Sequence, residues 1–384
     1  MAILKVDTIS GIGTEGPVFE GDVKFTSQNF LTLPKGDTTQ RIITSSGIST
    51  ETGAVRYNTD SNKMECYIGS TWMEVAVSSP NLGDTQSSAG GRGIFFGGRD
   101  PNMSDTIDYV TISSAGNAID FGNMTNTRRA YSAMGDRTRG LAAGGIYNSS
   151  GNNTNQIDFV TISSTGDAQD FGDLTSAKAW HAGVNNATRG LIAGAWSPSN
   201  EIEYVTIQSA GNALDFGDLT EAQQTDGSFS SPTRGFWVGG ASGSGPAYNA
   251  STTGTVIECV TTATLGNAFD FGDLINGTYG KVGASNSIRG LAAGGYGSPA
   301  NITAIELITL ATLGNATDYG DLTTAYYYAA GTSDTTRAIF GGGEGPINTI
   351  EYVTIATRGD SVDFGDLTVT RRQNKATSNA NGGL

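Results

Sequence analysis

The sequence has few of the residues that catalysis and metal binding most often use. It contains one histidine, His181, and two cysteines, Cys66 and Cys259, which lie far apart in the chain. One imidazole and two distant thiols do not make a compact zinc or copper site, nor the disulfide framework of a small secreted domain. We therefore expect no cofactor and no metal. Calcium held by Asp and backbone oxygens stays open as an alternative, although no Asp-rich ligand loop stands out.

Positive charge and long apolar runs are also scarce. The chain has 22 Lys and Arg against 37 Asp and Glu, which gives a formal net charge of −15. Binding to phosphate backbones depends on clustered Lys and Arg, so we expect no nucleic-acid partner. No stretch approaches the roughly 20 apolar residues that span a bilayer, and Lys5 and Asp7 interrupt the start where a signal peptide needs an apolar run. We expect neither membrane insertion nor export by that route.

Glycine is abundant instead, at 55 of 384 residues, while charged residues make up only 15%. About 7% glycine and 25% charged residues are usual in globular proteins. This composition favours many tight turns between strands and few solvated helices.

One unit recurs six times between residue 92 and the end of the chain. Each copy has an Asp-Phe-Gly or Asp-Tyr-Gly motif, and a strand-like tetrad such as YVTI begins eleven residues before it. An Arg that opens a run such as RGLAAGG follows the first five motifs by nineteen residues, and a further copy of the run opens at Arg92. The motifs begin at Asp120, Asp170, Asp215, Asp270, Asp318 and Asp363, and the five arginines are Arg139, Arg189, Arg234, Arg289 and Arg337.

The period of about 45 to 55 residues is typical of propeller blades. Each unit has four short apolar or β-branched runs separated by turn residues, which predicts a four-stranded antiparallel meander. In the second copy the four strands are expected near residues 176–184, 189–195, 201–207 and 212–219. One such sheet cannot bury both of its faces, so six should stack around an axis.

The two ends of the repeat region predict how such a ring closes. The first copy begins at its second strand, and the segment TVTRRQNKATSN at 368–379 is similar to TNTRRAYSAMG at 125–135. The late segment is therefore expected to supply the first strand of the first sheet, with residues 83–91 as the alternative. The paired glycines of RGLAAGG also resemble the doublet that ends the second strand of a kelch repeat, although the Tyr and Trp usual in kelch repeats are replaced here by the Phe or Tyr of the motif. The fold class predicted is an all-β, six-bladed, kelch-like β-propeller over residues 81–384.

Length varies between copies only between the second and third strands. That connection and the one leading to the next copy should emerge on the same face, because successive strands of a meander alternate in direction. Variable loops on a rigid scaffold often bind ligands, although loops that are mere spacers also tolerate insertions. The candidate ligand-binding residues on these loops are Tyr147, Trp196, Tyr248 and Tyr296.

The repeated Asp and Arg residues are expected to be structural, because catalysis rarely needs six identical copies. The Asp could hold a turn or pair with the Arg of a neighbouring strand. His181 should pack near the central channel, beside Trp180. Arg128, Arg129, Arg371 and Arg372 precede first strands and are expected to be structural or to contact a ligand. The Asp-box motif of sialidases is missing, and we expect no catalytic residues.

Residues 1–80 lack the repeat and form a second, β-rich segment. Alternation in AVRYN and MECYIG, with turn residues Asn58, Asp60 and Asn62 between them, predicts a hairpin. The run from Gly53 to Trp72, preceded by GDVKFTSQNFLTLP, is similar to a module near the start of tail-fibre and other virion appendage proteins of tailed bacteriophages, notably cyanophages. The resemblance implies a trimer-prone segment that anchors the protein to a virion.

Together these features predict a phage virion protein of the tail-fibre or appendage type, which is made in the host cytoplasm and carried on the particle. Its partners would be other virion proteins and a glycan or protein of the host surface, read by the propeller as an adhesin. Two alternatives stay open. One is a purely architectural virion protein, and the other is a glycan-cleaving enzyme on the same scaffold.

Overall fold

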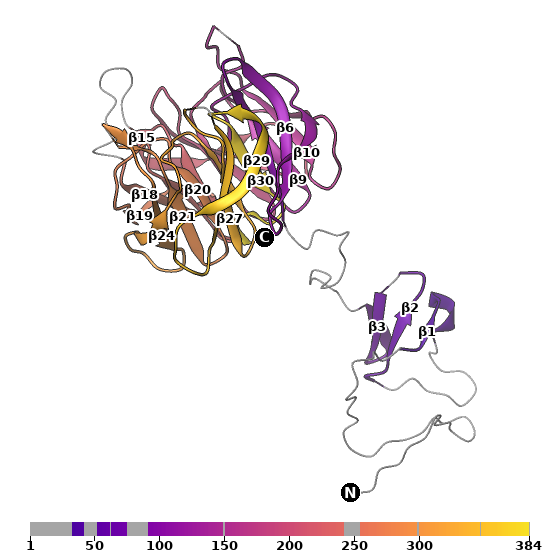
Figure 1. Cartoon of the computed structure of the whole chain (residues 1–384). Helices are drawn as coiled ribbons and strands as arrows, with labels where there is room; N and C mark the ends of the chain where they lie inside the picture. The colour runs from indigo at the N-terminus through magenta and orange to yellow at the C-terminus, as the bar shows by residue number, and fades with distance from the viewer. Residues whose placement is uncertain are drawn as a thin grey trace, which may run out of the picture. The chain divides into compact units, whose positions relative to one another are not determined.

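A computed structural model describes residues 33–41, 52–61, 63–74, 91–148, 150–241, 254–297, 299–345 and 347–383. The contacts divide the chain into two units, Met1–Asn81 and Leu82–Leu384, and each is considered by itself. Both consist of β-strands (Figure 1). The described residues include no helix that is long and apolar enough to cross a membrane.

The N-terminal unit contains a four-stranded sheet in the order β1-β2-β3-β4, in which β1 runs parallel to β2 and the other neighbours are antiparallel. The predicted hairpin is confirmed, because Val55 pairs with Cys66 and Asn58 with Lys63. Glu65 of β3 is fully buried and forms ion pairs with Arg41 and Arg56. The elements are β1 (Lys35–Gly36), the 3-10 turn η1 (Thr38–Gln40), β2 (Val55–Asn58), β3 (Lys63–Ile68) and β4 (Thr71–Glu74).

The second unit contains six four-stranded antiparallel sheets, numbered here in chain order. Sheet 1 comprises β30 (Lys375–Ser378), β5 (Arg92–Arg99), β6 (Met103–Thr111) and β7 (Ile119–Asn123). Sheet 2 comprises β8 (Ser132–Gly135), β9 (Arg139–Ala143), β10 (Gln156–Thr161) and β11 (Gln169–Asp173). Sheet 3 comprises β12 (Ala182–Asn185), β13 (Arg189–Ala193), β14 (Ser199–Thr206) and β15 (Leu214–Gln223).

Sheet 4 comprises β16 (Gly227–Ser230), β17 (Arg234–Val238), β18 (Val256–Thr261) and β19 (Phe269–Asp273). Sheet 5 comprises β20 (Val282–Ser285), β21 (Arg289–Ala293), β24 (Ala304–Thr309) and β25 (Thr317–Asp321), with a small ribbon of β22 (Tyr296–Gly297) and β23 (Ala300–Asn301) between β21 and β24. Sheet 6 comprises β26 (Ala330–Ser333), β27 (Arg337–Gly341), β28 (Ile347–Thr354) and β29 (Val362–Arg371). The 3-10 turn η3 (Asn381–Gly383) follows β30.

The predicted four-strand unit is confirmed in the second copy, where β12 to β15 fall on the expected segments. The expected origin of the first strand of sheet 1 is also confirmed, because β30 pairs with β5 in antiparallel register, Lys375 opposite Phe96. The yellow strand β30 accordingly lies with the purple strands of the same unit in Figure 1. Segments from the two ends of the repeat region therefore share one sheet.

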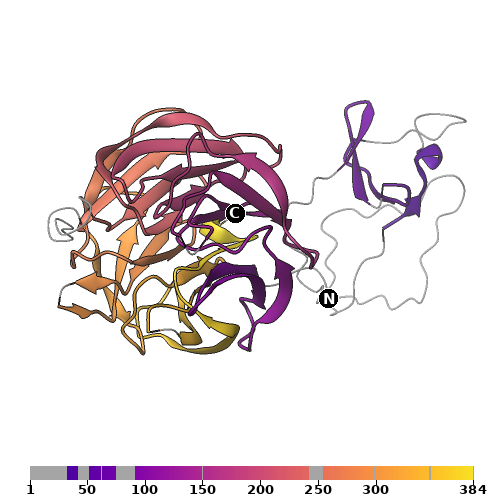
Figure 2. The same ribbon diagram turned by 90° about the horizontal axis from the view of Figure 1, so that it is seen from above.

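The first strands of the sheets, here called the inner strands, contact one another in succession. Each contacts the next, from β8 through β12, β16, β20 and β26 to β30, and β30 in turn contacts β8. Figure 2 shows the sheets following one another in chain order around the unit. Apolar side chains fill the space between neighbouring sheets, as in the cluster that joins Phe96 and Phe121 of sheet 1 to Val160 of sheet 2.

The repeated arginines join each sheet to the one after it. Arg139 Nη1 donates to the carbonyl oxygen of Ile207 in sheet 3 at 3.1 Å, and its guanidinium lies over the ring of Phe159 at 4.8 Å. Arg337 of sheet 6 makes the equivalent bond to Ile112 of sheet 1. Arg92, Arg189, Arg234 and Arg289 likewise donate to carbonyl oxygens of the following sheet.

The suggested pairing of the repeated Arg with the motif Asp is therefore wrong, since no such ion pair occurs among the described residues. The motif aspartates are exposed on the last strand of each sheet. The other suggested role, holding a turn, is seen in one copy, where Asp270 accepts from the backbone N–H of Gly272 at 3.0 Å.

The glycine of the motif explains more of its recurrence than the aspartate does. Gly217 has φ of 150°, and a Cβ added there would lie 2.5 Å from the carbonyl oxygen of Gly266, in the turn between β18 and β19 of the next sheet. The motif glycines of the other five copies meet the following sheet in the same way. The buried Phe or Tyr before the glycine packs in the core between sheets. The motif is thus a contact between sheets, in which only glycine allows the backbones to approach this closely.

A second set of contacts between sheets uses buried carboxylates. Asp158 of sheet 2 accepts from the backbone N–H and hydroxyl of Thr125, which follows sheet 1. A cation completes four of the six sites, as Arg128 does for Asp158 at 2.5 Å. The six carboxylates, all on third strands, are Asp108, Asp158, Glu203, Glu258, Glu306 and Glu351.

Candidate functional site

A belt of backbone hydrogen bonds surrounds one end of the inner strands. It is formed by the residues two positions before each inner strand, here called the entry residues: Ala130, Trp180, Thr225, Gly280, Tyr328 and Gln373. Trp180 N–H donates to Ala130, Ala130 to Gln373, Gln373 to Tyr328, and Tyr328 to Gly280, at 2.8–3.1 Å. The five residues joined by these bonds have φ between 54° and 69°. This left-handed conformation is uncommon for residues other than glycine.

The belt is irregular at sheet 4. Thr225 does not share the left-handed conformation, and its hydroxyl instead bonds the backbones of Ala182 and Ala193. The N–H of Gly280 donates to a carboxylate oxygen of Asp226 at 3.0 Å, where a carbonyl serves at the other sites. Among the six entry positions, the one before β16 is thus where a titratable carboxylate, that of Asp226, replaces a backbone carbonyl as the acceptor.

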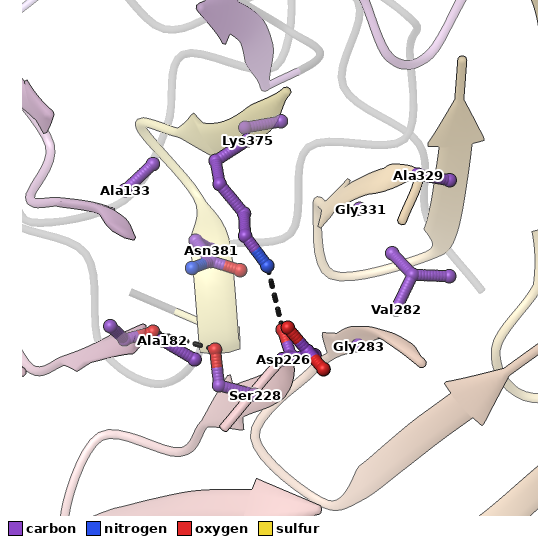
Figure 3. A pocket seen from close by; sticks show the side chains of 12 residues that line it. Ala133, Ala182, Asp226, Ser228, Val282, Gly283, Ala329, Gly331, Lys375 and Asn381 are labelled. Carbon is purple, nitrogen blue, oxygen red and sulfur yellow. Dashed lines mark hydrogen bonds between the residues drawn. The ribbon is translucent and has the colours of Figure 1, made fainter. Parts of the chain in front are cut away.

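A cavity runs along the axis of the inner strands, and residues from all six of them line it (Figure 3). Its volume is about 30 Å³, and a cavity needs roughly 10–15 Å³ to hold one water molecule. The inner cavity therefore has space for one or two water molecules rather than for a sugar ring. The lining residues include Ala133, Gly183, Ser228, Gly283, Gly331 and Ala376.

Two ionisable side chains meet in this inner cavity. Figure 3 shows Lys375 reaching from β30 toward Asp226, where its Nζ donates to the main-chain oxygen of Asp226 at 2.7 Å. Burial raises the pKa of Asp226 above its ordinary value and lowers the pKa of Lys375. Gln224 also donates to the Asp226 carboxylate at 2.7 Å. The opposite end of the cavity is lined by Asn381 of η3, whose amide binds Asn185 at 3.2 Å.

A second, smaller pocket opens between the inner cavity and the belt. It shares Asp226 and Lys375 with the inner cavity and is bounded by the entry residues Trp180, Tyr328 and Gln373. His181 also lines this mouth pocket and is fully buried, as expected from its place in the sequence. Burial lowers the pKa of His181 to about 3, so the imidazole is neutral at physiological pH.

Six aromatic rings form a continuous array at the mouth. Trp180 and Tyr328, whose inner strands belong to sheets 3 and 6, have ring centroids only 4.8 Å apart. Trp196 extends the array from Trp180 at 5.9 Å. Tyr327, Tyr279 and Tyr296 continue it beyond Tyr328, with centroid distances between 4.7 and 6.0 Å. The rings come from connections that lead into or lie within sheets 3, 5 and 6.

The structure brings together two of the four predicted ligand-binding residues. Trp196, with 40% of its surface exposed, and the half-buried Tyr296 lie at the two ends of the array. Tyr147 is equally exposed but makes no ring contact with the array among the described residues. Tyr248 lies outside the described residues. The predicted shared face of the two kinds of connection is confirmed by backbone bridges such as Tyr279 to Tyr296.

Of the four arginines singled out in the sequence, two are structural and two lie at the mouth. Arg128 and Arg371 are fully buried and pair with Asp158 and Asp108. Arg129 and Arg372 each come one residue later and are only partly buried. Arg129 lies over the ring of Trp180 at 5.8 Å.

Four residues of the array were not predicted from the sequence as site residues: Trp180, Tyr279, Tyr327 and Tyr328. They occupy the connection between sheets, whose constant length gave no reason to expect binding there. A signal was nevertheless present, because these positions change freely between copies while the flanking residues recur.

The described residues contain no group of three or more His, Cys, Asp or Glu side chains that could hold a metal ion. No known family model matches this sequence. A search of curated proteins likewise finds no significant match.

Proposed function

We propose that the six sheets form a closed six-bladed propeller that serves as a binding head. Three independent sets of contacts support closure, because each links every sheet to the next and the last sheet to the first. These are the contacts of the inner strands, the bonds from the repeated arginines and the approach of the motif glycines to the following sheet.

We further propose that this head binds a ligand at the mouth without transforming it. The observation that carries this proposal is the array of six aromatic rings between Trp196 and Tyr296. The belt itself does not require aromatic side chains, because Ala130, Gly280 and Gln373 adopt the same backbone conformation. Trp180 and Tyr328 keep large rings where left-handed backbone costs free energy, which is common at functional sites. Rigid aromatic surfaces provide contact area at a small loss of entropy.

The biological setting we propose is a phage virion, with the N-terminal unit as the anchor and host-surface recognition as the role of the head. The setting rests on the resemblance of residues 53–72 to virion appendage proteins. The N-terminal sheet adds support for self-association, because one of its faces exposes Val55, Met64, Ile68 and Met73. An exposed apolar face on a small sheet is typical of an interface.

The test is binding of the full chain to intact bacterial cells and to their purified surface polysaccharide, with released sugar measured in the same samples. We expect binding without sugar release. Trp196→Ala should weaken it at least tenfold. Phe269→Ala is the matched control, because Phe269 is a similarly exposed aromatic on the last strand of sheet 4.

Each other outcome has a definite meaning. Equal losses in both variants would show that the mouth is not the binding site. No binding to any host surface would favour the purely architectural role, in which the head contacts other virion proteins. Released sugar would replace the binding proposal with the glycan-cleaving one.

A further inference from the structure

Three arginines lie together beside the array. Arg129 lies over Trp180, whereas Arg372 interacts with Tyr327 and Glu344. Arg99 ends β5, whereas Arg129 and Arg372 lie three residues before β8 and β30. Arg99 and Arg372 exchange backbone hydrogen bonds of 3.0 and 3.2 Å. Arg129 touches the same group from the other side, because its Nη1 donates at 2.9 Å to Gln373, the residue after Arg372.

Their positive charge is only partly compensated. Arg372 forms an ion pair with Glu344, whereas neither Arg99 nor Arg129 has a carboxylate within 4 Å in the described part of the chain. Burial and the neighbouring Arg99 and Arg372 lower the pKa of Arg129 to about 10, so it is still protonated at neutral pH. Like charges held close together in a partly buried place repel one another and destabilise the fold, and a bound anion would relieve this repulsion.

We propose that the three arginines and the two tryptophans bind an acidic sugar, meaning a sugar unit that carries a carboxylate, within a surface polysaccharide. The inference rests on the proposed binding function and names its ligand class. Guanidinium groups bind carboxylates through paired, charge-assisted hydrogen bonds. The sugar carboxylate lies on Arg129, with Arg99 and Arg372 adding positive charge around it.

The tryptophans decide between a sugar and a simple anion. Arg129 lies 5.8 Å from the ring centroid of Trp180, and Trp196 lies beside that ring. The guanidinium covers the ring of Trp180, so a sugar whose carboxylate lies on Arg129 would extend toward the exposed indole of Trp196. The narrow inner cavity leaves the ligand outside, on this surface. The net charge of −15 for the whole chain makes the arginine cluster a local exception, which supports a specific anion rather than general attraction.

The experiment compares carboxylated polysaccharides with the same polymers after chemical reduction of their carboxyl groups to alcohols. Binding of the full chain to a panel of uronic-acid polymers is measured by calorimetry at 50 and 500 mM NaCl. We expect at least tenfold weaker binding to the reduced polymers, and weaker binding at high salt. Arg129→Gln should lose at least tenfold in affinity for the acidic polymers and little for the reduced ones.

Arg358→Gln is the control, because Arg358 is an exposed arginine in the connection between β28 and β29. Equal affinity for acidic and reduced polymers would overturn the acidic-sugar proposal while leaving the binding function intact. Absence of binding to the whole acidic panel, with host cells still bound, would have the same meaning. Absence of binding to cells as well would remove both. The comparison of polymers uses the unaltered protein, so it holds even where Arg129→Gln fails to fold.

Discussion

Arg337 in sheet 6 donates from Nη1 to the main-chain oxygen of Ile112 in sheet 1 at 3.1 Å, although 225 residues separate them. Its guanidinium also lies over the ring of Tyr352 at 4.6 Å. Arg139 makes the same pair of contacts in the middle of the series. The two arginines therefore allow a test of whether the junction of the last and first sheets resembles the others.

We expect Arg337→Ala and Arg139→Ala each to lower the free energy of unfolding by about 1.5–3 kcal/mol, the usual range for hydrogen bonds to charged groups. Urea denaturation followed by tryptophan fluorescence measures both. A normal loss for Arg139→Ala together with no loss for Arg337→Ala would contradict a closed ring. Arg358→Ala should change stability by less than about 0.5 kcal/mol, because this arginine is exposed.

Glu258 should respond to an added cation. It has no ion pair among the described residues, and its buried Oε2 lacks a hydrogen-bond partner. The position that holds the cation at two other sites, Arg128 for Asp158 and Lys178 for Glu203, is occupied at the Glu258 site by Gln223. We expect Gln223→Lys to stabilise the protein by about 1 kcal/mol or more at pH 8, because an unpaired buried charge is costly.

The same site predicts the sign of a pH dependence. Burial raises the pKa of Glu258 above its ordinary value of 4.5, so the folded protein keeps a proton that the unfolded chain has lost. The contribution of Glu258 to stability is therefore present below about pH 4.5 and is lost as pH rises through the folded pKa. The advantage of Gln223→Lys over the wild type should grow from pH 4 to pH 8 in urea denaturation. A constant difference across this range would contradict the assignment to Glu258.

The motif glycine offers a test of the close approach between sheets. Gly217→Ala places a Cβ 2.5 Å from the oxygen of Gly266, and we expect a loss of about 3 kcal/mol or more. Gly266→Ala is the control, because Gly266 has a nearly identical φ of 153° but open space where its Cβ would lie. Thermal denaturation of both variants separates the collision from the backbone strain. Similar losses would mean that strain alone accounts for the glycine.

The exposed face of the N-terminal sheet predicts self-association of the full chain. We expect a trimer in light scattering, and Ile68→Asp with Met73→Asp should convert it to monomer because charges would enter an apolar interface. Leu313→Asp, at an exposed leucine of the repeat region, should leave the mass unchanged. A monomeric wild-type protein would contradict anchoring through a trimer.

Much of the fold was predictable because it depends on repetition. The spacing of the Arg, the tetrad and the motif fixed the strands, and the similarity of residues 368–379 to 125–135 identified β30. The partners of the repeated arginines were not predictable, because main-chain carbonyls have no signature in a sequence. Of the two roles proposed for the motif Asp, pairing with the repeated Arg is not seen among the described residues, whereas holding a turn is seen at Asp270.

The site was predicted in part for a similar reason. Variation in length pointed to Trp196 and Tyr296, which do lie in the array. Trp180 and Tyr328 lie in connections whose residue type varies between copies while the length stays constant. Their contact joins sheets 3 and 6, which are far apart in the sequence. Only the three-dimensional arrangement brings their rings to 4.8 Å.

Sheet 1 cannot be completed until the end of the chain has been synthesised, because β30 pairs with β5. Arg92 binds Asn379 across 287 residues, so at roughly 5–20 residues per second the ribosome needs about 15–60 s to supply the strand that covers β5. During that interval β5 presents an open edge, which can pair with other nascent chains. We therefore expect the yield of folded protein to rise when a chaperone shields this strand edge for up to a minute, or when a low expression temperature reduces association between nascent chains.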